Sequence, residues 1–236
     1  MPAPYYVSPE QIMQEKEDFA RKGIEKAKEV IVLEYRDGIL MVAENPLATV
    51  FKISEIYDRI ALAATGLYPD YEALRYAGIQ GAEIKGFTFN REDVTARWLA
   101  NQYSQQIGAI YRQPDMKPLE VELLLCEIRE DSSSNNRIYH LSFDGTFWED
   151  NQYTVIGGRA DEIAGILENE YSDGLDLSGA VRLAARTFET IEAEADEAER
   201  YQVTAETIEA AVLDETLNRR KFKRLLPDEL SEILSA

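Results

Sequence analysis

The order of strand-like and helix-like segments restricts the fold of this chain more than any other feature of its sequence. A first run of segments rich in β-branched and large apolar residues, typical of strands, spans positions 30–35, 39–44, 49–53 and 59–64. Patterns typical of two helices follow at 70–81 and 91–111, before a second run of strands at 121–125, 138–143 and 154–156. A second helix pair, at 158–171 and 177–194, precedes a last strand pair at 207–213 and 222–226.

Grouped strands and paired helices indicate an α+β protein. This order argues against a doubly wound parallel sheet, because the strands and helices of such a sheet would alternate singly along the chain. Two antiparallel sheets that face each other, each covered by a helix pair, would bury every apolar face that the sequence contains. We therefore predict a four-layer αββα sandwich built from one domain, since 236 residues can bury a large common core.

Local signals at two places refine this prediction. Asp37-Gly38 separates the first two strands and is typical of a two-residue hairpin turn. Near the N-terminus, Ser8 is a suitable N-cap, Pro9 falls at the first helical position, and Gln11 stands three residues after the cap as a capping-box partner. These residues predict an additional N-terminal helix that ends near Lys28.

The composition excludes several classes of function. Lys and Arg total 25 against 44 Asp and Glu, and the net charge of -19 disfavours nucleic acids and anionic membranes as partners. One cysteine, Cys126, and one histidine, His140, exclude a disulfide framework and an imidazole-rich or multi-cysteine metal site. We therefore expect no metal and no cofactor. The start of the sequence lacks the pattern of a secretion signal and no apolar run is long enough to span a bilayer, so we expect a cytoplasmic protein.

The residues alone do not identify a catalyst. His140 lies in an alternating strand segment, and no G-x-S-x-G motif supplies a serine for it. Cys126 has no electropositive neighbours in sequence, which favours a buried structural thiol. The segment Gly157-Gly158-Arg159 could present N–H groups to an anion, but it lacks a phosphate-loop lysine, and close packing of helix and sheet explains it better. Carboxylate pairs are abundant because the chain is acidic, so a glycosidase site has no specific support.

A resemblance to a known family covers nearly the whole chain. The segments SPEQIMQEKEDFARKGIEKA, VIVLEYRDGILMVAENP, FKISEIYDRIALAATGL and GGR occur in this order. They are similar to segments of 20S proteasome α-type subunits of the bacterial, actinobacterial kind, which have the αββα fold of N-terminal nucleophile hydrolases. The resemblance implies one domain over 1–236, with a gating arm at 1–8, a helix at 9–28, the sandwich at 29–226 and a C-terminal tail at 227–236.

Active members of that fold need a Thr, Ser or Cys as the first residue of the first strand, because its free α-amino group is the base. The residue at that position in this chain is about Lys28, which is preceded by 27 residues that contain the N-terminal helix. The resemblance therefore implies a non-catalytic subunit of an outer seven-membered ring, with hydrolysis performed by catalytic β subunits. The alternative is a self-processing N-terminal nucleophile hydrolase, which cleavage before a Thr, Ser or Cys would support. A further alternative is an acidic binding protein without β partners.

The resemblance also implies a site for the C-terminal tail of an activator, a ring-shaped proteasomal ATPase that delivers substrate proteins, and it implies pupylated proteins as those substrates. Lys52 matches the family lysine that pairs with the carboxylate of the tail, and such a charge-assisted bond suits that role. Gly66 and Leu67 match the pocket wall, where a glycine lets the backbone of the tail approach closely. Without the resemblance, Lys52 would be interpreted as an ordinary exposed strand lysine.

The N-terminal arm matches the gate of the family, in which seven copies converge over the axial pore. The implied gate residues are Met1, Pro2, Ala3, Pro4, Tyr5, Tyr6, Val7, Ser8 and Pro9. Pro9 matches the proline of the turn at which activators shift the gate, and Glu17 matches an acid of the helix. The Tyr-Asp-Arg triplet of archaeal and eukaryotic members is absent between Pro2 and Pro9, as in bacterial members, so the geometry of their open gate does not carry over.

Overall fold

Two antiparallel sheets form the centre of the protein. The computed structural model describes residues 8–45, 50–128, 135–194 and 202–235. Within these ranges, one sheet contains β1 (Val30–Tyr35), β2 (Gly38–Glu44), β8 (Tyr153–Ile156), β9 (Ile208–Asp214) and β10 (Phe222–Leu225), in the order β10-β9-β2-β1-β8. The other contains β3 (Ile53–Tyr57), β4 (Ile60–Gly66), β5 (Val121–Glu127), β6 (Arg137–Leu141) and β7 (Phe147–Asp150), in the order β3-β4-β5-β6-β7.

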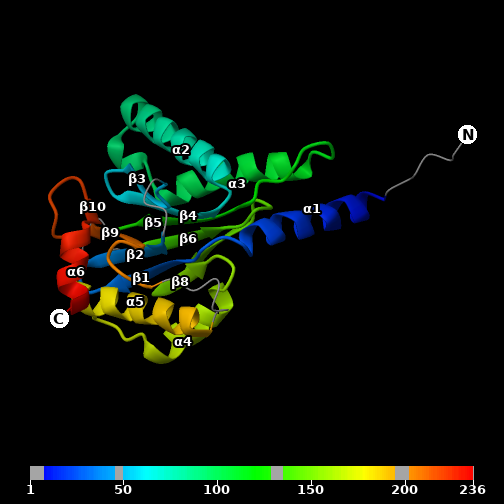
Figure 1. The fold of residues 1–236 in the computed structure, drawn as a ribbon. Coiled ribbons are helices and arrows are strands. Elements are labelled where there is room, and N and C mark those ends of the chain that lie inside the picture. The colour runs from blue at the N-terminus through cyan, green and yellow to red at the C-terminus, as the bar shows by residue number, and fades with distance from the viewer. Residues whose placement is uncertain (1–7, 46–49, 129–134, 195–201, 236) are drawn as a thin grey trace, which may run out of the picture.

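The sheets lie face to face, and helices cover both outer faces (Figure 1). The helices α2 (Tyr68–Thr88) and α3 (Ala96–Arg112), with a 3-10 turn η1 (Arg91–Asp93) between them, pack on the second sheet. On the first sheet lie α4 (Ala160–Glu170) and α5 (Leu177–Glu194), and α6 (Pro227–Ser235) packs against α5. Between the sheets, Val32 and Met41 meet Ala63 and Leu124 in a fully buried layer. The predicted αββα sandwich is confirmed.

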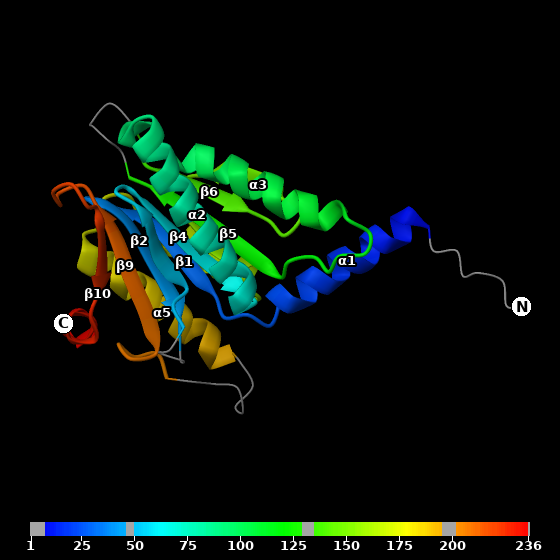
Figure 2. The ribbon, with the colours of Figure 1, turned by 90° about the horizontal axis from the view of Figure 1, so that it is seen from above.

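The N-terminal helix α1 (Pro9–Ile24) projects from one end of the sandwich (Figure 2). As predicted, Ser8 caps it, since its Oγ accepts a hydrogen bond from Gln11 N at 3.2 Å. Lys16 interrupts the apolar face of the helix and is itself buried, because its ammonium donates to the carbonyl of Tyr111 at 3.0 Å and to that of Gln113. The helix ends at Ile24, four residues earlier than predicted. The next residues join the sandwich, where the carbonyl of Ala27 accepts a hydrogen bond from Gly158 N at 3.2 Å.

Several predicted elements need correction. The first hairpin turn consists of Arg36-Asp37, one residue before the predicted pair, because Tyr35 pairs with Gly38. The helix expected at 70–81 extends from Tyr68 to Thr88. The helix expected at 91–111 is the turn η1 followed by α3, which begins at Ala96 with Thr95 as its cap. The strand expected at 49–53 is β3, which begins at Ile53, and β7 was not predicted.

The loop expected between β5 and β6, and most of the acidic segment after α5, lie outside the described residues. In the ranges that the structure describes, no helix is both long enough and apolar enough to cross a membrane.

Candidate functional site

Lys52 lies directly before β3, where the two sheets approach each other. Its backbone N–H donates to Glu209 Oε2 at 2.9 Å, and the N–H of Ile53 donates to Glu209 Oε1 at 3.1 Å. Glu209 belongs to β9 of the other sheet, so it fixes the segment that carries Lys52. The Lys52 ammonium donates to the carbonyl of Lys28 at 2.5 Å. The side chain is therefore directed into the protein, and the interpretation as an ordinary exposed lysine is wrong.

The environment of Lys52 lowers the pKa of its ammonium to about 8. Burial is the main cause, because it penalises the charged form. The nearby carboxylates of Glu44, Glu29 and Glu209 oppose this effect and favour the ammonium, whereas the positive charge of Lys28 adds to it. Lys52 can therefore lose its proton at a pH far below the ordinary value for lysine, and an arriving carboxylate would stabilise the protonated form.

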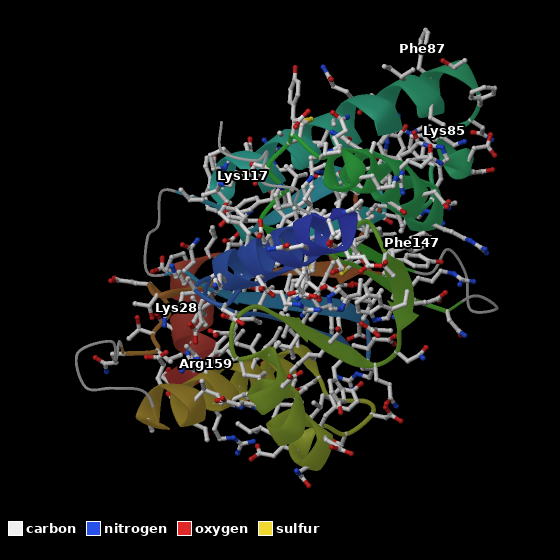
Figure 3. The ribbon with its side chains drawn as sticks, turned by 90° about the vertical axis from the view of Figure 1, so that its right-hand side faces the viewer. Lys28, Lys85, Phe87, Lys117, Phe147 and Arg159 are labelled. Atoms are coloured by element: carbon white, nitrogen blue, oxygen red, sulfur yellow. The ribbon has the colours of Figure 1, made fainter. Side chains whose placement is uncertain are left out.

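Lys52 belongs to a group of charges at the junction between α1 and β1, which we call the junction cluster. Its carboxylates are buried, whereas its cations are partly exposed. Arg159 donates to Glu192 Oε1 at 2.7 Å and to Glu29 Oε1 at 3.1 Å. The Lys28 ammonium lies 3.1 Å from Glu192 Oε1 and 3.4 Å from Glu44 Oε2. Figure 3 shows Lys28 and Arg159 below α1. With Lys52, the cluster holds three cations and three carboxylates: Lys28, Lys52, Arg159, Glu29, Glu44 and Glu192.

Packing and ion pairs account for the residue types in the segment Gly157-Gly158-Arg159. Gly157 has a φ of 118°, which side-chain-bearing residues rarely adopt. A Cβ atom on Gly158 would lie 2.2 Å from the carbonyl oxygen of Glu25, so the glycine permits close packing against the end of α1. The guanidinium of Arg159 is engaged with Glu29 and Glu192. The packing interpretation is therefore confirmed, and the ion pairs of Arg159 are a feature that the sequence analysis missed.

Gly66 and Leu67 line a pocket beside α1. The pocket, about 430 Å³ in volume, is also lined by Phe19, Lys22, Gly23, Lys26, Ala27 and Glu120. Gly66 has a φ of 108°, and a Cβ atom on it would lie 2.0 Å from the carbonyl oxygen of Glu120. Only glycine fits this close approach. The volume is in the range of clefts that hold small ligands, so a few residues of peptide could enter.

The structure brings Gly66 and Leu67 together, but Lys52 lies behind the pocket wall. The Lys52 ammonium donates to the carbonyl of Lys28. Lys28 directly follows Ala27, which lines the pocket. The hydroxyl of Thr65 also donates to this carbonyl, at 2.8 Å. Thr65 directly precedes Gly66, which lines the pocket. The carbonyl of Lys28 therefore links the ammonium of Lys52 to the backbone of the pocket.

The position that the resemblance assigns to a nucleophile holds no nucleophile in this chain. Lys28 follows Ala27, so its backbone nitrogen is an amide and cannot act as a base. Its side-chain ammonium is engaged with Glu192 and Glu44. The arrangement can bind charged groups, but it does not present the hydroxyl or thiol with a free α-amino group that the hydrolytic mechanism requires.

His140 and Cys126 occupy the second sheet away from this pocket. His140 on β6 is buried, with Nε2 2.7 Å from Glu122 Oε1 and Nδ1 3.4 Å from Asp150 Oδ2, and its ring stacks on Trp148. Burial lowers the pKa of His140, but hydrogen bonds with Asp150 and Glu122 outweigh burial and raise it above the ordinary value. Cys126 is fully buried, and this burial raises the pKa of its thiol. Both predictions, a packed histidine and a structural thiol, are confirmed.

Most of the implied gate lies outside the described residues, which begin at Ser8. Ser8 and Pro9 form the start of α1, and Glu17 lies one turn before Arg21, with which it forms an ion pair at 2.9 Å. Among the described residues, no group of three or more His, Cys, Asp or Glu side chains could hold a metal ion.

Comparisons with known proteins show to which family this chain is similar. A family model described as "Proteasome subunit" matches residues 24–208. A proteasome subunit alpha of Nocardioides sp. is 44% identical over 235 residues, which cover 99% of this chain and 90% of the relative. Proteins with the same description from Streptomyces coelicolor and Acidothermus cellulolyticus are each 43% identical, covering 100% and 99% of this chain and 91% and 98% of the relatives.

Proposed function

Because the chain belongs to the proteasome subunit family and is of the α type, we propose that it is a non-catalytic ring subunit that gates substrate entry. The observation that supports this proposal most directly is the lysine at the position of the nucleophile. Lys28 is enclosed in the junction cluster and has an amide nitrogen, so hydrolysis falls to separate catalytic β subunits. Full-length similarity to α-type relatives supports the same role.

The proposed complex is a seven-membered α ring stacked on a ring of β subunits in the cytoplasm. Ring-shaped ATPases would dock on the outer face of the α ring and deliver substrate proteins, pupylated ones in bacteria of this kind. The N-terminal arm, residues 1–8, together with Pro9, would form the gate over the pore.

The pocket beside α1 is the proposed receptor for the C-terminal tail of the activator. The backbone of the tail would pass Gly66, where the absence of a side chain allows close approach. Its terminal carboxylate would be attracted by Lys52, which the junction cluster holds one residue away from the pocket wall. An ammonium in a site with little water binds a carboxylate more strongly than an exposed one does.

Reconstitution tests the proposed function. We expect the purified chain alone to show no peptidase activity, and a mixture with a β subunit to give a large particle that hydrolyses peptides. Size-exclusion chromatography followed by a fluorogenic peptide assay measures both. Peptidase activity from this chain alone, together with a new N-terminus at a Thr, Ser or Cys, would contradict the proposal.

The tail site is tested by Lys52→Ala, with Lys223→Ala on an exposed part of β10 as the matched control. We expect only the first variant to lose affinity for a tail peptide, measured by fluorescence anisotropy on assembled particles. Because the pKa of Lys52 is lowered to about 8, affinity for the wild type should fall by up to about ten-fold between about pH 7 and pH 9. Equal affinity of both variants would exclude the pocket role.

The gate is tested by deletion of residues 1–7. We expect the assembled particle to hydrolyse short peptides faster, because an obstructing segment has been removed. Unchanged turnover in particles of unchanged size would refute the gate.

A further inference from the structure

The segment that contains β7 and β8 joins the edges of the two sheets. Strand β7 lies at the end of the second sheet and β8 at the end of the first, and two residues, Asn151 and Gln152, connect them. Among the described strands, β7 pairs with β6 and β8 pairs with β1. Figure 3 shows Phe147, at the start of β7, at one side of the molecule. Because an edge strand has one ladder of backbone hydrogen bonds, side-chain contacts determine how firmly such a segment is held.

His140 of β6 contacts the start of this connection. It lies opposite Trp148 in the register of β6 and β7, and the centroids of the two rings are 4.2 Å apart. Its Nδ1 lies 3.4 Å from Asp150 Oδ2 at the end of β7. The same carboxylate oxygen accepts a hydrogen bond from Thr154 Oγ1 of β8 at 2.7 Å. Side-chain contacts therefore lead from β6 through the end of β7 to β8.

The other ring nitrogen of His140 leads to the first sheet by a second route. Nε2 lies 2.7 Å from Oε1 of Glu122, which belongs to β5. Oε2 of Glu122 accepts a hydrogen bond from the backbone N–H of Gly157 at 3.3 Å, and Gly157 directly follows β8. His140 therefore links the second sheet to both ends of β8, through Asp150 near its start and through Glu122 just beyond its end.

Two carboxylates flank one imidazole here, and this arrangement needs a proton. A neutral imidazole has one N–H and one lone pair, whereas the imidazolium has two N–H donors. Only the imidazolium can donate to Glu122 and Asp150 at the same time. Burial raises the pKa of Asp150, but hydrogen bonds from His140 and Thr154 outweigh burial and lower it. The carboxylate and the imidazolium therefore stabilise each other's charged form.

The other groups around His140 also favour its protonated form. The indole of Trp148 stacks on the imidazole and attracts a cation. Glu122 and Trp148 line a groove of about 470 Å³ beside α1. The other charged residues of this groove are Arg21, Glu25, Asp144 and Asp161, so acids outnumber the one cation. Helix α3 covers the opposite face of β6, where Tyr139 and Leu141 lie.

We propose that His140 is a proton-controlled latch for the segment 147–156. While the imidazole is protonated, it donates to Glu122 and Asp150 and holds the segment on both sheets. After it loses one proton, the remaining N–H donates to Glu122, the nearer carboxylate, and the lone pair of Nδ1 faces Asp150. The attachment of β7 through Asp150 is then lost, and the segment opens locally. The inference concerns contacts within one chain, so it does not depend on the proposed function.

The latch is closed at low pH and opens as the pH rises. Because the pKa of His140 is raised in the folded protein, protonation contributes stability that is complete below the ordinary value of about 6.5. This contribution is lost as the pH rises through the raised pKa. Since Glu122, Trp148 and Gly157 line the groove beside α1, the position of one wall of that groove depends on pH.

An NMR titration of the purified, untagged chain tests the protonation. His140 is the only histidine in the sequence, so its imidazole signals are identified without further variants. We expect them to titrate with a midpoint above about 6.5, with both ring nitrogens protonated on the acid side. On the basic side, the proton should remain on Nε2, which lies nearer its carboxylate.

Hydrogen exchange of the backbone amides in 147–156 tests the opening. After correction for the intrinsic effect of pH on exchange, their protection should decrease by about ten-fold or more between about pH 6 and about pH 9, because a charge-assisted hydrogen bond is lost. The amides of β9, in the interior of the first sheet, should keep their protection over the same range.

Three variants separate the latch from a general effect of pH. Asp150→Asn should keep the segment protected at every pH, because the amide can turn its oxygen toward the imidazolium or its NH₂ toward the lone pair of the neutral ring. His140→Phe, which has no ring nitrogen, should leave the segment weakly protected at every pH. Glu149→Gln is the matched control, since Glu149 is exposed, precedes Asp150 and pairs with Arg137 at 2.9 Å. It should keep the pH dependence of the wild type.

Three outcomes would overturn the proposal. The first is an NMR midpoint at or below about 6.5. The second is unchanged protection of 147–156 between the two pH values in the wild type. The third is an Asp150→Asn variant, native by circular dichroism, that loses protection at high pH as the wild type does.

Discussion

Glu209 holds the segment that carries Lys52, and replacing it with glutamine tests how that segment is fixed. Its carboxylate accepts four hydrogen bonds. Oε2 accepts from the N–H of Lys52 at 2.9 Å and from Asn45 Nδ2 at 3.0 Å. Oε1 accepts from the N–H of Ile53 at 3.1 Å and from the guanidinium of Arg224. Glu209 is 7% exposed, so water cannot easily replace these donors.

Glutamine has nearly the same shape but only one acceptor oxygen. In either orientation of its amide, the NH₂ group faces two donors, which then have no acceptor. Each buried donor without a partner costs about 1–3 kcal/mol, so Glu209→Gln should lower the free energy of unfolding by roughly 2–6 kcal/mol. A central value of about 4 kcal/mol corresponds to a decrease in Tm of about 8–16 °C for a chain of this length.

Thermal unfolding of the isolated chain, followed by circular dichroism, measures this change. Glu206→Gln is the matched control, because Glu206 lies three residues earlier and is exposed. The control should remain within about 0.5 kcal/mol of the wild type, as surface substitutions usually do. If Glu209→Gln unfolds at the temperature of the control, the four hydrogen bonds do not fix this segment.

Three further predictions concern the histidine, the helical glycines and the cysteine. The pKa of His140 is raised in the folded protein, so protonation of His140 stabilises the fold, and this stabilisation is complete below the ordinary pKa of about 6.5. The free energy of unfolding of the wild type should therefore exceed that of His140→Phe by an amount that decreases as the pH rises above that value. Gly78→Ala should lower the Tm, because a Cβ atom would lie 1.7 Å from the hydroxyl of buried Tyr103, whereas Gly165→Ala, with no atom within 4 Å, should raise it slightly. Cys126 should react with a thiol reagent only after unfolding, as a colorimetric assay with and without denaturant would show.

Sequence signals predicted an element correctly where the conformation favoured by neighbouring residues is also the one that the tertiary contacts favour. Ser8 was identified as a cap because the capping rule concerns only the next three residues. The start of α3 was predicted wrongly because Asn90 and Thr95 both satisfy that rule. The choice between them depends on Glu127 of β5, whose carboxylate accepts from the N–H of Ala96 at 3.0 Å. A contact that joins residues 31 positions apart cannot be read from local pattern.

The candidate site was predictable only in part, and for a similar reason. Lys52 and Gly66 were found through resemblance, because a lysine before a strand and a glycine at the end of one are common in any sequence. The ion pairs of Arg159 were missed, since its partner Glu29 lies 130 residues away in sequence. In a chain with 44 acidic residues, pattern alone cannot select the one carboxylate that meets a given arginine.

The contacts of the junction cluster indicate that the proposed tail binding at Lys52 can be tested separately from assembly. Burying charges costs free energy of hydration, and ion pairs often do no more than offset this cost, so the cluster is not an obvious source of stability. Its members come from the segment between α1 and β1, from β2, from the residue that precedes α4 and from α5, so the cluster fixes how these parts meet. Lys52 donates a hydrogen bond to the carbonyl of Lys28, which Thr65 also holds, and its charge interacts with Glu44 and Glu29 without a direct ion pair in the structure described. Removal of the Lys52 ammonium therefore leaves the pairs of Lys28 and Arg159 in place, so we expect Lys52→Ala to weaken the proposed tail binding without loss of the particle.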